Sequence, residues 1–126
     1  MKKSDINPMP QYFDRYINLV ADVELSQAFG DSIGKLNELD RSLLKRLDGK
    51  KYAPDKWTVK GLLQHVIDFE RILSYRSLLF ARREGSVPQG VDEYLLAAHM
   101  NAEDRPLDEL IDELKHRSRF NKVYVR

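Results

Sequence analysis

Residues 56–71 have the sequence KWTVKGLLQHVIDFER. Thr58 is placed to cap a helix, because its hydroxyl can accept a hydrogen bond from an early backbone N–H. The apolar residues after it recur at steps of three and four, which predicts an amphipathic helix over residues 59–83. Gly85 and Pro88 are expected to end that helix. Its predicted inward stripe consists of Leu62, Val66, Phe69, Leu73 and Phe80, widened by Ile72 and Leu79.

His65 lies in this stripe, three residues after Leu62 and four before Phe69. An inward imidazole needs a partner, because burying it unpaired costs roughly a few kcal/mol. As a metal ligand it would suit zinc, nickel or iron. A hydrogen bond to a backbone carbonyl or a tyrosine is the structural alternative, and the spacing alone favours that alternative.

Three further residues are candidates for a site around His65. Asp68 is a neighbour on the same side of the helix and could orient the imidazole; alternatively, it pairs with Arg71. Trp57 could form the wall of a pocket, or it could fix the preceding loop onto the core. His99 is a candidate for a second metal ligand, and its structural alternative is a surface histidine.

The composition limits the class of protein. A chain of 126 residues fits a single domain over 1–126. It has no cysteine, which excludes thiolate metal sites and cysteine nucleophiles. Lys plus Arg is 21 and Asp plus Glu is 20, so bulk charge does not indicate a nucleic-acid binder. We expect no membrane span, because no run approaches about 18 apolar residues. No secretory leader follows the first lysines, so a cytoplasmic protein is expected.

The remaining chain also predicts helices. A long one is expected over residues 25–47, ending near Gly49. Residues 50–56 are expected to connect it to the next helix, since Pro54 disfavours a helical residue before it. A short helix is expected at 92–101, and Pro106 should open another. Period-two alternation is absent, so the fold class predicted is all-α.

The two ends of the chain depart from this regular pattern. Pro8 and Pro10 argue against a helix at the start, and the aromatic residues of 1–20 predict a segment that packs on the body, through Tyr12, Phe13, Ile17 and Leu19. After Leu114 the apolar pattern stops, and residues 116–126 form a basic tail. An up-down bundle normally needs a fourth helix. Either another chain supplies it, or the bundle is incomplete, or the N-terminal segment fills the gap.

The stretch from Trp57 to Ile72 resembles the DinB-like superfamily, as do residues 12–17, 52–57 and 75–82. The resemblance covers roughly residues 8–117. Members are up-down four-helix bundles, often dimeric, whose site holds a divalent metal. The resemblance therefore implies a DinB-like bundle, a homodimer and a metal ligand at His65.

In that family two further histidine ligands usually lie on the fourth helix, and no segment of this sequence matches it. The sequence therefore resembles a family member truncated within its third helix, with a divergent tail and an incomplete metal site.

Two functions follow from these expectations. The first is a metal-dependent enzyme of the thiol-transferase or hydrolase type, in which a cation at His65 activates water or a thiol. The second is a non-catalytic, truncated bundle that acts as a self-associating interaction module, because an exposed apolar helix face drives association. The basic tail carries Phe120 and Tyr124, yet five charges beside a balanced domain are usually a solvated end. Nucleic acid is therefore not an expected partner.

Overall fold

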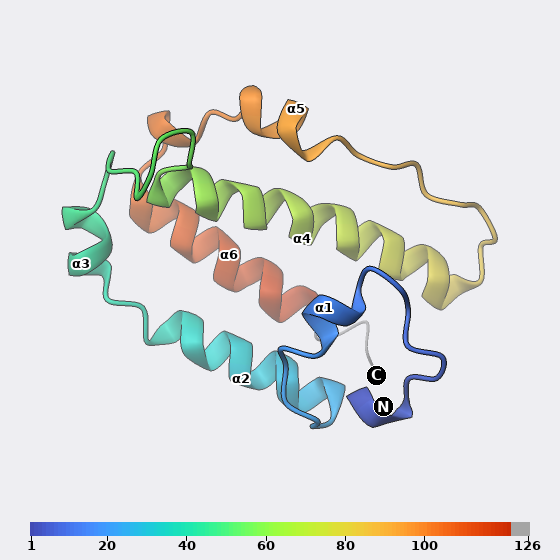
Figure 1. Ribbon diagram of the computed structural model, residues 1–126. Helices are drawn as coiled ribbons and strands as arrows, with labels where there is room; N and C mark the ends of the chain where they lie inside the picture. The colour runs from blue at the N-terminus through green and yellow to red at the C-terminus, as the bar shows by residue number, and fades with distance from the viewer. Residues whose placement is uncertain (122–126) are drawn as a thin grey trace.

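The computed structural model describes residues 1–121, with side chains through residue 119, and its regular structure over that range is helical. Three helices form the body: α2 (Leu25–Asn37), α4 (Val59–Arg82) and α6 (Leu107–Asn121). α6 packs against both α4 and α2 (Figure 1). The all-α fold class is therefore confirmed. No helix within residues 1–121 combines the length and apolar character needed to cross a membrane.

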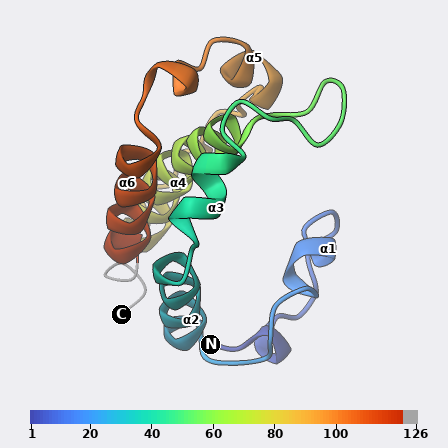
Figure 2. The same ribbon diagram turned by 90° about the vertical axis from the view of Figure 1, so that its left-hand side faces the viewer.

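Shorter helices join these three. They are the 3-10 turns η1 (Lys3–Asp5) and η2 (Ala102–Asp104) and the helices α1 (Asp14–Ile17), α3 (Arg41–Arg46) and α5 (Glu93–Ala98). Both α5 and η2 contact α4. Figure 2 shows α1 and α6 on opposite sides of α2, so the N-terminal segment that contains α1 lies away from the α4–α6 pair.

The start of α4 forms as the sequence predicts. The Thr58 hydroxyl accepts a hydrogen bond from the Gly61 N–H at 3.0 Å. The same hydroxyl donates to the Glu103 carboxylate, which ties the cap to η2. The helix ends at Arg82, and Arg83 adopts a left-handed φ of 52° as the C-cap. The predicted helix over residues 59–83 is thus confirmed to within one residue.

Removing this cap has a defined expected cost. Thr58→Ala leaves the Gly61 N–H without its acceptor, and we expect the free energy of unfolding to fall by about 1 kcal/mol, within a range of about 0.5–2 kcal/mol. Thr58→Ser keeps the hydroxyl and is the matched control. Urea denaturation followed by circular dichroism measures both variants. Equal stability of the alanine and serine variants would contradict the capping role.

The helix expected over residues 25–47 is wrong as a single element. It divides into α2 and α3, separated by residues 38–40. Asp40 is extended and its side chain accepts from the Leu43 N–H at 2.9 Å, which starts a new helix. Helix-capping by aspartate competes with helix continuation at this position. Gly49, with a φ of 73°, lies in the left-handed region, as expected near the end of this stretch.

The core is small and lies between α4 and α6. Ile67, Leu110 and Leu114 form its buried cluster, and Leu36 and Leu63 pack against that cluster. Ion pairs join α3 to α6. Arg41 donates to Asp108 and Asp112, and Lys45 pairs with Asp108 at 2.7 Å. The hydrogen bond from Lys45, and then that from Arg41, holds the pKa of the Asp108 carboxyl below its ordinary value.

The helix continues beyond Leu114, where the apolar pattern of the sequence stops. α6 continues to Asn121, and Ser118 on its fourth turn is buried. A small polar residue can continue a buried helix face without appearing in an apolar stripe, which is why the periodicity missed it. The rest of the predicted basic tail, residues 122–126, lies outside the described residues.

The predicted inward stripe of α4 is also wrong in direction. Leu62, Leu73 and Phe80 are 54%, 50% and 68% exposed, while Gly61, Gln64 and Ile67 are the buried residues of this helix. With about 3.6 residues per turn, these two sets lie on opposite sides of α4. α6 packs against the less apolar side, where Ile67 joins Leu110 and Leu114 in the core and Arg71 donates to Glu113.

The expectation that the N-terminal aromatic residues pack on the body is wrong for Tyr12, Phe13 and Leu19, which are all exposed. These aromatics contact one another instead. The rings of Tyr12 and Phe13 meet edge to face at 5.2 Å, and Arg15 lies 4.3 Å above the Tyr12 ring. Such local contacts partly satisfy the apolar rings without a tertiary partner.

Candidate functional site

His65 lies between two aromatic side chains. Its ring centroid is 4.4 Å from that of Trp57 and 4.7 Å from that of Phe69. The side chain is neither in the core nor in open solvent, but half-buried. No group within the described residues forms a hydrogen bond or ion pair with it. The predicted alternative, a hydrogen bond to a carbonyl or a tyrosine, is therefore not what holds this imidazole.

Trp57 is beside His65, as a pocket wall would be. It precedes the Thr58 cap, and its Cβ lies 3.3 Å from the position that a Cβ on Gly61 would take. Gly61 therefore lets the tryptophan fold back onto the first turn of α4. The indole contacts the imidazole and the first turn of α4, while its role as the wall of a pocket stays a prediction.

The structure does not gather the histidines into one site. His99 caps the C-terminus of α5 and is exposed. His116 lies on α6 and donates from Nδ1 to the Asp112 carbonyl at 2.7 Å. Across residues 1–121, no three His, Asp or Glu residues form a group that could hold a metal ion. The described residues of one chain therefore do not fit the multi-histidine site that the resemblance implies.

Asp68 is paired with an arginine, as the structural alternative predicts. Its Oδ1 accepts from Arg71 Nη1 at 2.8 Å and from Gln64 Nε2 at 2.9 Å. Neither of these two hydrogen bonds involves His65. Orientation of the imidazole by Asp68 thus has no support from this geometry.

Gln64 and Asp68 belong to a larger ion-pair network between α4 and α6. Arg105 donates from Nη1 to Gln64 Oε1 at 2.8 Å and from Nη2 to Glu109 at 2.6 Å and Glu113 at 2.9 Å. Arg71 also donates to Glu113, so the carboxylate joins two arginines. Buried polar groups need such partners to avoid the cost of desolvation.

The protonation of Glu113 reflects this network. Burial raises the pKa of its carboxyl, but the Arg105 hydrogen bond and the charges of Arg71 and Arg105 outweigh burial, so the pKa lies below its ordinary value. Sequence reasoning missed Arg105 and Glu113. The sequence does contain a signal for this network. Arg105 is followed at steps of four by Glu109 and Glu113, the spacing at which side chains on one helix face meet.

The exposed stripe of α4 is a second candidate surface. We call Leu62, Val66, Phe69, Leu73 and Phe80 the α4 apolar face; four of them are exposed and Phe69 is half-buried. Their successive spacings are four, three, four and seven residues, which match the a and d positions of a heptad repeat. Over 18 residues at about 1.5 Å each, the face is roughly 27 Å long.

Comparison with known proteins identifies no relative. No protein family matches this sequence, and no curated protein or solved structure is significantly similar to it. The arguments for function therefore depend on the geometry of this chain.

Proposed function

We propose that this chain is a helical self-association module in which two copies pair through the α4 apolar face. The supporting observation is that the most apolar side of the longest helix is exposed rather than packed against α6. The heptad spacing of the face suits a second helix laid along it, because a and d residues insert between those of a partner. A two-fold pair would use the same face on both copies.

The exposed surface area supports a second copy as the occupant. The chain exposes 9448 Å², whereas a folded monomer of 14.7 kDa is expected to expose about 6900 Å². The excess of about 2500 Å² exceeds the roughly 800 Å² per partner of a standard interface and reaches the range of obligate homodimers. The net charge of +1 also means that two copies repel each other little.

The oligomeric state tests this proposal. Size-exclusion chromatography with light scattering at about 10 µM, where a nanomolar dimer is fully formed, should give twice the chain mass of 14.7 kDa. Leu62→Lys with Leu73→Lys places four charges in the paired face, and we expect a monomer. Leu43→Lys with Leu47→Lys changes two exposed leucines of the α3 region and should stay dimeric. A monomeric wild type, or a dimeric L62K/L73K variant, contradicts the proposal.

We propose that the arrangement is DinB-like, on the resemblance of the stretch from Trp57 to Ile72. We also propose that the module acts in the cytoplasm, in keeping with a sequence that is 33% charged. A solved structure of the dimer tests the first statement, because a DinB-like bundle requires a fourth helix beside α4 and α6. Cell fractionation tests the second.

A second candidate function is metal-dependent catalysis of the thiol-transferase or hydrolase type. It is supported by one observation: the His65 imidazole is fixed by Trp57 and Phe69 and bonds to no described group. Since one chain lacks the other ligands among residues 1–121, a second copy would have to supply them. We expect zinc, nickel or iron at one equivalent or less per chain, lost in His65→Ala and retained in His116→Ala. Elemental analysis of the purified protein measures this, and a metal-free wild type rejects it.

A further inference from the structure

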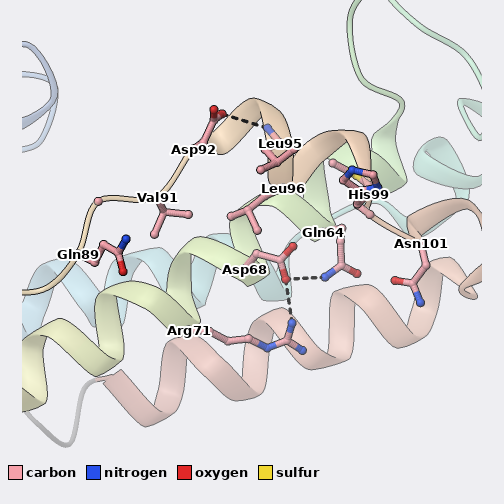
Figure 3. A pocket seen from close by; sticks show the side chains of 12 residues that line it. Gln64, Asp68, Arg71, Gln89, Val91, Asp92, Leu95, Leu96, His99 and Asn101 are labelled. Atoms are coloured by element: carbon pink, nitrogen blue, oxygen red, sulfur yellow. Dashed lines mark hydrogen bonds and ion pairs between the residues drawn. The ribbon is translucent and has the colours of Figure 1, made fainter.

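A cleft of about 580 Å³ lies between α4 and the segment around α5 (Figure 3). This volume is in the range of small-molecule sites, about 300–1000 Å³. Gln64, Asp68 and Arg71 of α4 line one wall, and Val91, Leu95 and Leu96 line the other. The cleft is on the side of α4 that carries Gln64, away from the α4 apolar face, so the two surfaces are independent.

The polar wall holds one carboxylate oxygen in a fixed position. Both hydrogen bonds that Asp68 accepts from Gln64 and Arg71 reach Oδ1. No described residue bonds to Oδ2, and Figure 3 shows this oxygen on the α5 side of the carboxylate, away from Arg71. Gln64 is only 4% exposed and is itself held by Arg105. Asp68 is therefore preorganised, and an arriving donor need not order the side chain.

The opposite wall is apolar and unfilled. Val91, Leu95 and Leu96 all remain exposed, although they face the cleft rather than a packed core. A ligand that covers them gains the burial of their surface. The ligand that fits both walls has a hydrogen-bond donor at one end and a short apolar body at the other.

The charges of the cleft favour a cation over an anion. The Arg71 guanidinium is already committed to Asp68 and Glu113, and of these two carboxylates Asp68 lines the cleft. Asp92 adds a second acidic group at the edge, where its Oδ1 caps α5. Opposite charges attract most strongly where water is partly excluded. We propose that this cleft binds small primary amines, with the ammonium on Asp68 Oδ2 and an apolar body against Val91, Leu95 and Leu96.

The probe for this proposal is 2-phenylethylamine, with 2-phenylethanol as its uncharged counterpart. Isothermal titration of the wild type should give a dissociation constant for the amine of about 1 mM or tighter, and at least about tenfold weaker binding of the alcohol. Asp68→Asn should weaken amine binding by at least about tenfold. Asp112→Asn, a carboxylate that pairs with Arg41 outside the cleft, should bind as the wild type does.

A second variant separates loss of the site from loss of the fold. Leu96→Trp fills the cleft from an exposed position, so we expect an unchanged melting temperature and no amine binding. The L62K/L73K variant should bind the amine normally, because its changes lie on the other side of α4. Absence of binding at about 10 mM amine, equal binding of amine and alcohol, or undiminished binding by Leu96→Trp overturns the proposal.

Discussion

Replacing Leu110 with alanine is expected to lower the free energy of unfolding by about 2–5 kcal/mol. Leu110 is 0% exposed and lies in the cluster with Ile67 and Leu114 that joins α4 to α6. Truncation removes buried apolar surface and leaves a cavity between the helices. Small domains are stable by only about 5–15 kcal/mol, so this one change removes a large share of the stability.

Leu19→Ala is the control for that prediction, because it deletes the same atoms from a side chain that is 82% exposed. We expect its free energy of unfolding to stay within about 0.5 kcal/mol of the wild type. Chemical denaturation followed by tryptophan fluorescence measures both, since Trp57 is the single tryptophan. Similar losses in the two variants would show that Leu110 does not lie in the core.

The difference between these leucines could be predicted only in part from the sequence. The capped helix at Thr58, its end near residue 83 and the helix after Pro106 all follow from local signals, and all are present. The last helix buries Leu107, Leu110, Ile111 and Leu114, which recur at the steps of three and four that an amphipathic helix predicts. Local capping and periodicity act within one element, so one sequence reveals them.

The direction of α4 could not be predicted in this way. Periodicity identifies the most apolar side of a helix, and it assumes that this side is buried. In this chain the buried side carries Gly61, Gln64 and Ile67, while the leucines at 62 and 73 face outward. The choice depends on what lies across the interface, namely Arg105 before α6 and Glu113 within it, and no local pattern contains that information.

For the candidate sites, too, the sequence reveals contacts within one helix but not contacts between elements. His65 beside Phe69 follows from their spacing of four, and the ring of Trp57 was among the expected neighbours. The cleft was missed because its two walls come from α4 and from residues 89–101, which a single helix pattern cannot relate. For the same reason, the sequence could not place His99 at this cleft instead of at a metal site.

Replacing Arg105 with methionine is expected to destabilise the fold by about 1–3 kcal/mol at pH 7. The variant keeps much of the apolar stem, but it removes the donors to Gln64, Glu109 and Glu113. Gln64 and Glu113 are largely shielded from water, so water replaces the lost bonds poorly. Arg82→Met, at an exposed position at the end of α4, should change stability by less than about 0.5 kcal/mol.

The pH dependence identifies the cause of that loss. The pKa of Glu113 in the folded protein lies below its ordinary value, so its stabilising contribution is full above the unfolded pKa of about 4.3. It is lost as the pH falls through the lower, folded value. In Arg105→Met the pKa is lowered less, and the contribution is smaller at neutral pH. The stability difference between wild type and variant should therefore be largest above about pH 5 and should shrink in acid. Urea denaturation across this range measures it, and a difference that stays constant with pH would assign the loss to packing instead of to the Glu113 ion pair.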